Sequence, residues 1–241
     1  MSIGGNSGIG FDTVAAFAAS PKYHVIMASR TREKGEAAIS ELKERNLPGT
    51  ISLQLLDVTS SKSVSAAAEA IEKEFGKLDF LINNAGVVSQ DPDLEVRMRA
   101  TLDANATGAA VASYGFEPLL KKSNNPRIVH VSSALGSLTL RDNLEGPDSK
   151  THSPAYRMSK AALSMLAIIT AKEFGKWGCK VWAMCPGWVV TNLTGPAGRE
   201  FRIKGGALSA ETSAETIFKI GEGERDAEVG KFVHKDGVYP W

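Results

Sequence analysis

The sequence lacks several features that would assign it to common protein classes. Only 2 of its 241 residues are cysteines, Cys179 and Cys185, and neither has a second Cys or His at metal-ligand spacing. We therefore expect two buried structural thiols and no metal site. The formal net charge is +1 and no Lys/Arg block is present, so we expect neither nucleic acid nor a membrane surface as a partner.

Long apolar runs and targeting signals are lacking as well. The longest apolar stretch, around residues 161–171, contains Ser and Thr and is far shorter than the roughly 20 residues that span a bilayer. The N-terminal MSIGGNSGIG has neither the basic nor the apolar region of a signal peptide. These absences favour a soluble, cytoplasmic protein, and the 43% of hydrophobic residues is enough to build a core.

Short apolar runs instead alternate with amphipathic stretches along the whole chain. The runs have strand length, the stretches have helical periodicity, and such alternation predicts βαβ units with a parallel sheet covered on both faces. Because no linker or repeat divides the chain, we predict one doubly wound, Rossmann-like α/β domain over residues 1–241. The predicted strands lie within 23–29, 51–57, 79–86, 127–133 and 179–187, and the predicted helices within 32–45, 61–75, 94–122 and 155–176.

A glycine-rich turn opens the chain, with Gly4, Gly8 and Gly10 in the pattern GxxxGxG before an Ala-rich helix that begins near Phe11. Glycines allow the backbone to turn sharply and approach a pyrophosphate, and the amides at the start of a helix favour an anion. Asn6 suits the same turn because its side chain tolerates left-handed geometry. A glycine-rich helix entry without a ligand is the alternative. The turn residues predicted to bind a dinucleotide are Gly4, Asn6, Ser7, Gly8, Ile9 and Gly10.

A buried strand normally leads into such a turn, but here only residues 1–3 precede it. We therefore predict a first central strand that is truncated or missing. Its loss would leave buried backbone groups of the neighbouring strands unpaired, at a cost of about 1–3 kcal/mol each. Either the sheet rearranges or the chain is shortened, and the sequence leaves both open.

The residues after the second predicted strand indicate which dinucleotide is used. Ser29 and Arg30 stand roughly 20 residues beyond the glycine turn, where an acidic residue would bind the 2′-hydroxyl of NAD. A small Ser followed by Arg30, with Arg32 nearby, offers space and positive charge for a 2′-phosphate. This favours NADP(H) over NAD(H), the alternative being a solvated basic helix entry.

Seven motifs occur in an order and spacing that resemble the short-chain dehydrogenase/reductase family, in the manner of carbonyl reductases, over nearly the whole chain. They are GGNSGIG at 4–10, LLDV at 55–58, NNAG at 83–86, Asn105, VSS at 131–133, YRMSK at 156–160 and PGWVVT at 186–191. The resemblance implies an oxidoreductase that transfers a hydride between a nicotinamide and a carbonyl or secondary alcohol.

The same resemblance assigns the catalytic residues Asn105, Ser133, Tyr156 and Lys160. Tyr156 and Lys160 share one helix face at i,i+4, and a nearby ammonium favours phenolate, so we expect Lys160 to lower the pKa of Tyr156, the general acid/base. The resemblance also implies that Lys160 binds the nicotinamide ribose and that Asn105 holds a relay water. Ser133, with Ser132 as the fallback, polarises the carbonyl oxygen.

Further cofactor-binding positions follow from the resemblance alone. Asp57 and Val58 frame the adenine, Asn84, Ala85 and Gly86 line the floor, and the segment holding the carboxamide contains Pro186, Gly187, Val189 and Thr191. Two positions depart from the family pattern. Ile3 replaces Thr or Ser before the turn, and Ser7 stands where many NADPH users have Arg or Lys, which weakens the preference for NADP.

The substrate region is predicted from two irregular stretches, residues 134–152 and 187–209. Their apolar side chains favour a moderately apolar small molecule, as for carbonyl reductases or enzymes of specialised metabolism, although core packing would explain them equally. Predicted lid residues are Leu138, Leu140, Arg141 and Leu144, and predicted walls are Leu135, Trp188, Leu193 and Trp241.

Assembly and two rival functions stay open. The predicted helix from Ala155 carries small and apolar residues that suit a subunit interface, or seam, of a homodimer or homotetramer. The alternative is that they face the protein's own sheet. These residues are Ala162, Leu163, Leu166 and Ile169. A catalytically impaired nucleotide-binding protein would follow if the short first strand spoiled the cleft. A sugar-nucleotide epimerase or dehydratase uses the same Tyr and Lys but is generally longer.

Overall fold

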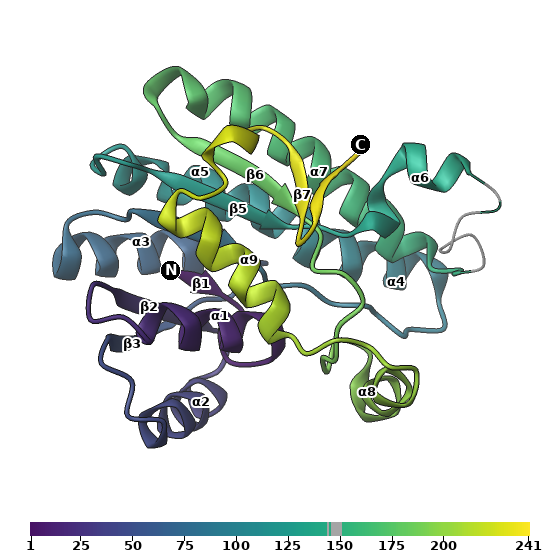
Figure 1. Cartoon of the computed structure of the whole chain (residues 1–241), viewed down its shortest axis with the longest axis horizontal. Coiled ribbons are helices and arrows are strands. Elements are labelled where there is room, and N and C mark those ends of the chain that lie inside the picture. The colour runs from purple at the N-terminus through teal and green to yellow at the C-terminus, as the bar shows by residue number, and fades with distance from the viewer. Residues whose placement is uncertain (144, 146–150) are drawn as a thin grey trace.

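An eight-stranded sheet runs through the computed structural model, which describes residues 1–143, 145 and 151–241 (Figure 1). The strand order is β3-β2-β1-β4-β5-β6-β7-β8, with parallel pairing except for the antiparallel β7–β8 pair at one edge. The chain winds outward from β1 in both directions, so the predicted doubly wound α/β fold is confirmed. The strands are β1 Ser2–Ile3, β2 His24–Ser29, β3 Thr50–Leu55, β4 Phe80–Asn83, β5 Arg127–Val131, β6 Lys180–Met184, β7 Phe232–His234 and β8 Gly237–Tyr239.

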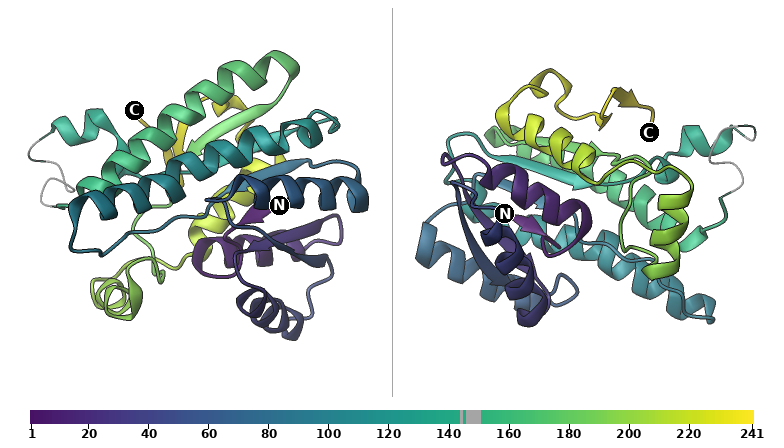
Figure 2. Two further views of the ribbon diagram at one scale, coloured as in Figure 1. Left: turned by 180° about the vertical axis from the view of Figure 1, so that it is seen from behind. Right: turned by 60° about the horizontal axis from the view of Figure 1, so that its bottom comes forward.

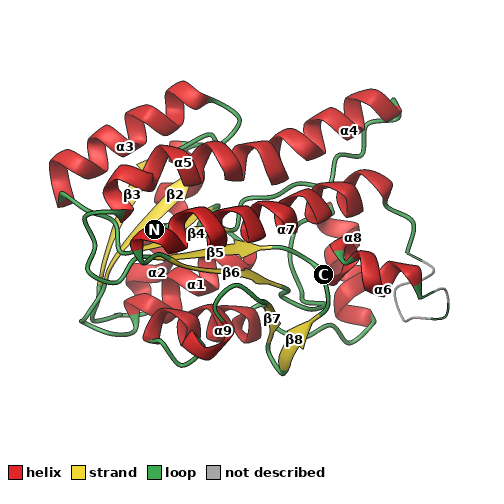
Figure 3. Cartoon of the chain, turned by 90° about the horizontal axis from the view of Figure 1, so that it is seen from above, coloured by secondary structure: helices red, strands yellow, loops and turns green. Residues whose placement is uncertain are grey.

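Helices cover both faces of the sheet, and Figure 3 shows them as two layers, with α1, α2 and α9 on one face and α3, α4, α5 and α7 on the other. The short helices α6 and α8 lie near the carboxyl ends of the strands. The α-helices are α1 Gly8–Ala18, α2 Arg32–Glu44, α3 Ser61–Phe75, α4 Leu94–Leu102, α5 Gly108–Leu120, α6 Leu138–Asp142, α7 Pro154–Phe174, α8 Gly195–Lys204 and α9 Glu211–Glu222; the shorter turns are η1 Asp103–Thr107, η2 Ala134–Gly136, η3 Gly175–Trp177 and η4 Asp226–Glu228.

Each sheet face has its own apolar cluster because side chains alternate along a strand. On β5, Ile128 packs with Phe116 of α5 in one cluster, and Val129 packs with Phe17 of α1 in the other. All five residues of β5 are buried. A central strand covered on both sides is therefore apolar almost throughout, as the run in the sequence indicates.

Strand β1 is two residues long and lies between β2 and β4 in the middle of the sheet (Figure 2). The pairing continues into the glycine turn, where the amides of Gly4 and Gly5 both donate to the Ala28 carbonyl, at 3.1 and 3.0 Å. The Ile82 amide donates to the Met1 carbonyl at 2.9 Å. The first strand is short, as predicted, and the alternative of a rearranged sheet is wrong, because β1 and the turn pair with both β2 and β4 in the middle of the sheet.

Some predicted loops contain regular structure. Helix α8 lies within residues 187–209, which the sequence predicts to be irregular. Pro196 in the first turn of α8 is a helix-start signal. Strands β7 and β8 form an antiparallel pair near the C-terminus. Leu138, Leu140 and Arg141 belong to helix α6, and Leu144 lies outside the described residues. Among the residues that are described, no helix is both long and apolar enough to cross a bilayer.

Candidate active site

A cavity of about 1270 Å³ opens where the parallel strands end at their carboxyl side, the edge where ligands bind in open α/β sheets. It is larger than the roughly 300–1,000 Å³ of a typical single-ligand pocket, so it has room for a dinucleotide and a second small molecule. Most of the predicted site residues line it: Gly4, Asn6, Ser7, Gly8, Ile9, Ser29, Arg30, Asp57, Val58, Asn84, Ala85, Gly86, Ser133, Tyr156, Lys160, Pro186, Gly187, Val189 and Thr191.

The glycine turn has the geometry that a pyrophosphate requires. Gly4 and Gly8 have φ of +73° and +53°, a conformation that favours glycine. Ser7, the N-cap residue of α1, makes no side-chain cap hydrogen bond, so the first amides of the helix are left for an anion. The prediction that Gly10 binds the dinucleotide is wrong, because Gly10 does not line the cavity. A Cβ on Gly10 would lie 2.2 Å from the Gly4 carbonyl oxygen, so its role is close packing beneath the turn.

The expected adenosine end of the cavity carries two basic side chains. Arg30 and Lys34 both line the cavity beyond β2, and Lys34 was missed in the sequence although it lies one helical turn beyond Arg30. Hydrogen bonds from Thr59 lower the pKa of Asp57, and the nearby charge of Arg30 acts in the same direction. Arg32, expected to add charge here, is exposed and pairs with Glu36 at 3.4 Å.

Helix α7 holds the central pair. Lys160 is 4% exposed, its Nζ donates to the Val131 carbonyl at 2.7 Å, and it lies 5.6 Å from the centroid of the Tyr156 ring. The hydroxyl of Ser133 lies close enough to Tyr156 to oppose the rise in its pKa, and both side chains line the cavity. Thus Ser133, two residues beyond the end of β5, and Tyr156 of α7, which are 23 positions apart in the sequence, meet within the cavity.

The expected lowering of the Tyr156 pKa is wrong for this structure. Burial is the dominant influence and raises the pKa of Tyr156 to about 12, with Cys185 acting in the same direction and with Ser133 and Arg202 opposing it. Burial also lowers the pKa of Lys160 to about 8. Since removal from water disfavours a phenolate, Tyr156 holds its proton at neutral pH and is ready to donate it.

The two candidate serines have different surroundings. Ser132 Oγ donates to the Lys160 carbonyl at 3.0 Å and lies 2.8 Å from Ser164 Oγ, which ties β5 to α7. Ser133 Oγ accepts from the Leu135 amide at 3.2 Å and faces Tyr156. The geometry therefore places Ser133, and not its neighbour, beside the hydroxyl of Tyr156.

Asn105 occupies a π-turn, η1, in the middle of the predicted long helix, and π-turns often occur at functional sites. Its side chain is fully buried and does not line the cavity. The Asn105 Oδ1 accepts a hydrogen bond from the Val87 amide at 2.7 Å. The Asn105 Nδ2 donates to the Val87 carbonyl at 2.9 Å and to Ser159 Oγ at 3.0 Å. A Cβ on Gly86 would lie 3.3 Å from Asn105 Oδ1 and 3.7 Å from Lys160 Nζ. Asn105 thus fixes the floor of the site next to Lys160.

Side chains from loops and short elements form the other end of the cavity. Leu135, Trp188 and Leu193 line it as predicted. Trp241 does not, because its ring stacks on Phe232 at 5.6 Å. The predicted lid residues Leu138, Leu140 and Arg141 do not line the cavity either, and Leu138 is 74% exposed. Several residues that line the cavity here had no predicted role in the site, among them Cys185, Phe201, Arg202 and Tyr239.

Both cysteines are buried, as predicted.

Of the predicted seam residues on α7, Leu163 and Leu166 are buried within the protein, whereas Ala162 and Ile169 are exposed. Half of that seam therefore faces the protein's own core.

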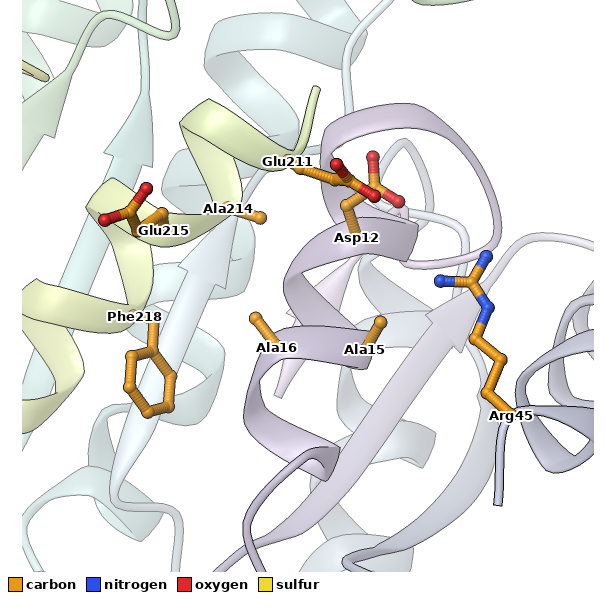
Figure 4. Close-up of a pocket in the computed structure, with 8 residues that line it drawn as sticks. All are labelled: Asp12, Ala15, Ala16, Arg45, Glu211, Ala214, Glu215 and Phe218. Atoms are coloured by element: carbon orange, nitrogen blue, oxygen red, sulfur yellow. The ribbon is translucent and has the colours of Figure 1, made fainter. Parts of the chain in front are cut away.

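A second hollow of about 300 Å³ lies between α1 and α9 (Figure 4). The carboxylates of Asp12 and Glu211 lie beside each other there, with the Arg45 guanidinium directed toward them. Burial, followed by the charge of Glu211, raises the pKa of Asp12. None of the predicted site residues lines this hollow, which is therefore separate from the large cavity.

A family model described as "short chain dehydrogenase" matches residues 1–200, which include the glycine turn, Tyr156 and Lys160. The chain belongs to this family. Among similar short-chain dehydrogenases, "Short-chain dehydrogenase/reductase tropE" of Talaromyces stipitatus is 33% identical over 97% of this chain and 94% of its own length. "Carbonyl reductase [NADPH] 1" of Mus musculus is 27% identical over 99% of this chain and 96% of its own length.

Solved structures of short-chain dehydrogenases have the same fold. An NADPH-bound carbonyl reductase from chicken fatty liver superimposes with a TM-score of 0.83, at 24% identity, covering 100% of this chain and 97% of that one. L-sorbose reductase from Gluconobacter frateurii, in complex with NADPH and L-sorbose, gives a TM-score of 0.81 at 20% identity, covering 96% and 92%. At these identities the likeness establishes the fold alone.

Proposed function

We propose that this short-chain dehydrogenase is an NADP(H)-dependent oxidoreductase that interconverts a carbonyl compound and a secondary alcohol. The observation that carries the proposal is that Ser133, Tyr156 and Lys160 converge in one cavity with the glycine turn. The rival of an impaired nucleotide-binding protein is not favoured, because the short β1 keeps its place and the turn keeps its geometry.

The nicotinamide, when bound in its reduced form, supplies a hydride to the carbonyl carbon. Tyr156, which is protonated at neutral pH, donates its proton to the carbonyl oxygen, because the alkoxide that forms there is a stronger base than the phenolate left behind. Ser133 donates a hydrogen bond to the same oxygen as negative charge develops there. The ammonium of Lys160 provides a positive charge beside Tyr156 and donors for a ribose hydroxyl. Asn105 positions the floor of the site next to Lys160, and we also propose that it holds a relay water.

The residues lining the cavity fit a dinucleotide at its glycine-rich end. The amides at the start of α1 would bind the pyrophosphate, and Asp57 with Val58 would frame the adenine. Arg30 and Lys34 would hold a 2′-phosphate, in keeping with the NADPH in the name of the mouse carbonyl reductase.

Absorbance at 340 nm tests the activity, with NADPH and a panel of aldehydes, ketones and quinones. We expect turnover by the wild type and a loss of at least about 100-fold in kcat for Tyr156→Phe, since general acid catalysis contributes about 10²–10⁴-fold. NADPH affinity, followed by its fluorescence, should change little. Equal rates for the two proteins would contradict the mechanism, and tight NADPH binding without any turnover would favour the binding protein.

The choice of dinucleotide is tested separately with Arg30→Ala. Loss of a charge-assisted contact of about 1.5–3 kcal/mol to the phosphate should reduce the NADPH over NADH preference in kcat/KM by roughly 10- to 100-fold. Arg32→Ala is the matched control, since Arg32 pairs with Glu36 outside the cavity. An unchanged preference in Arg30→Ala would show that the 2′-phosphate is not bound there.

A further inference from the structure

Helix α8 brings a cation to the substrate end of the cavity. Arg202 is partly buried and lines the cavity together with Tyr156, Trp188 and Phe201. Its Nη1 donates to Thr194 Oγ1 at 2.6 Å and to the Gly198 carbonyl at 3.0 Å, so the guanidinium is anchored to the first turn of its own helix. It is therefore held in place without any ligand.

The remaining donors of this guanidinium, on Nε and Nη2, have no acceptor among the residues that the structure describes, and no described carboxylate pairs with Arg202. Lys204, two residues further along α8, is by contrast paired with Glu200 at 2.7 Å. The charge of Arg202 also reaches the reacting centre, where it opposes the rise in the Tyr156 pKa. A partly buried, preorganised cation with spare donors beside a catalytic hydroxyl is suited to an anion.

Two aromatic rings stand next to this cation. Trp188 and Phe201 contact each other edge to face, with 6.2 Å between ring centroids, and they are 50% and 69% exposed. The Trp188 ring packs against the end of α8, where a Cβ on Gly205 would lie 2.3 Å from it. Exposed aromatic rings at the wall of a cavity have apolar faces available to a flat ligand.

We propose that Arg202 binds the carboxylate of a ring-bearing aldehyde or ketone, with Trp188 and Phe201 covering the ring while the carbonyl group reaches Ser133 and Tyr156. This inference rests on the proposed function and narrows its substrate class from apolar carbonyl compounds in general to those with an acidic group. A guanidinium binds a carboxylate through two parallel hydrogen bonds, which also orients the ring relative to Tyr156.

The test compares 3- and 4-formylbenzoate with their methyl esters, which keep the ring and the aldehyde but remove the charge. With NADPH, the wild type should show a kcat/KM at least about 10-fold higher for one of the acids than for its ester, the size of a charge-assisted contact. Arg202→Gln should abolish that difference, because it should slow the acid at least about 10-fold more than the ester. Arg202→Lys, which keeps the charge, should retain part of the preference.

Arg199→Gln is the matched control, because Arg199 is exposed on the same helix and does not line the cavity; it should behave as the wild type. Equal values for acid and ester in the wild type, or the same preference in Arg202→Gln, would overturn the inference while leaving the reductase activity intact. Weaker NADPH binding by Arg202→Gln without substrate would also overturn it, because the charge would then serve the dinucleotide.

A binding measurement separates this inference from the proposed function. If neither acid nor ester is reduced by the wild type, the reductase proposal fails for these compounds, but titration with 4-(hydroxymethyl)benzoate, followed by tryptophan fluorescence, still examines Arg202. Binding that is weakened at least about 10-fold in Arg202→Gln and unchanged in Arg199→Gln supports the carboxylate site. Equal binding by all three proteins contradicts it.

Discussion

The two ends of the large cavity are built from different parts of the chain. At the dinucleotide end, backbone groups of the glycine turn and of the residues after β4 form the surface, and a Cβ on Gly4 would already lie 3.0 Å from the Cα of Ala85. At the substrate end, the surface consists of side chains such as Trp188 and Phe201, which are carried by the segment after β6 and by α8.

This difference shows where the site tolerates change. Backbone packed against backbone leaves no space for an added methyl group, and such overpacking typically costs about 1–3 kcal/mol. Side chains on exposed segments can be exchanged without disturbing the sheet. We therefore expect the dinucleotide end to be intolerant of small changes and the substrate end to vary in specificity.

The largest effect is expected for Gly10→Ala, beneath the dinucleotide end. The added Cβ would lie 2.2 Å from the Gly4 carbonyl oxygen, so the turn and α1 must move apart. NADPH affinity, measured by fluorescence titration, should fall by about 10- to 100-fold, which corresponds to about 1.4–2.8 kcal/mol.

Gly175→Ala provides the control for glycine substitution, because a Cβ at this position meets nothing within 4 Å and its φ is −58°. It should bind NADPH like the wild type. If Gly10→Ala bound NADPH equally well, the dinucleotide end would be more adaptable than its packing indicates, and the contrast between the two ends would be lost.

A smaller and more selective effect is expected for Gly136→Ala, at the junction of the two ends. Its Cβ would lie 2.5 Å from the carbonyl carbon of Lys160, so η2 would be displaced from α7 and Ser133 from Tyr156. We expect kcat to fall about 10-fold, since small misplacements of reacting groups are costly, while NADPH affinity is kept. A parallel loss of NADPH affinity would show that the junction supports both ends.

The smallest effect concerns His130, which lies beneath the site on β5. Its Nδ1 is 3.3 Å from Asn83 Nδ2 and its Nε2 is 3.2 Å from Thr170 Oγ1, and burial followed by the charge of Lys160 lowers its pKa from 6.5 to about 3. Between these values the unfolded chain binds a proton that the folded chain does not. Stability should therefore fall as the pH drops from 6.5 toward 3, by up to about 1.4 kcal/mol per pH unit.

Denaturant unfolding at pH 7, 6 and 5 measures this dependence. His130→Gln keeps a donor and an acceptor but has no proton to gain, so its stability should decline less steeply than that of the wild type. His152→Gln, at an exposed side chain outside the helices and strands, should leave the wild-type slope nearly unchanged. Identical slopes for the wild type and His130→Gln would exclude His130 as a source of acid sensitivity.

Much of the fold and of the dinucleotide end could be predicted because local patterns specify them. Alternating apolar and amphipathic segments gave β2 to β6 and α1, α2, α3 and α7 nearly at their observed limits. Glycines at fixed spacing predicted the turn, since few other residues adopt its backbone conformation. Helix α8 was missed because its exposed, mostly polar residues carry no strong periodicity, although Pro196 marked its start.

The sequence by itself determined the order of the layers, the glycine turn and the spacing of Tyr156 and Lys160, because each depends on neighbours along the chain. Only the tertiary structure decided that Gly10 and Asn105 act from beneath the cavity, that burial raises the pKa of Tyr156, and that Arg202 reaches it. Burial and electrostatic fields depend on groups that are distant in sequence and close in space, so no local pattern records them.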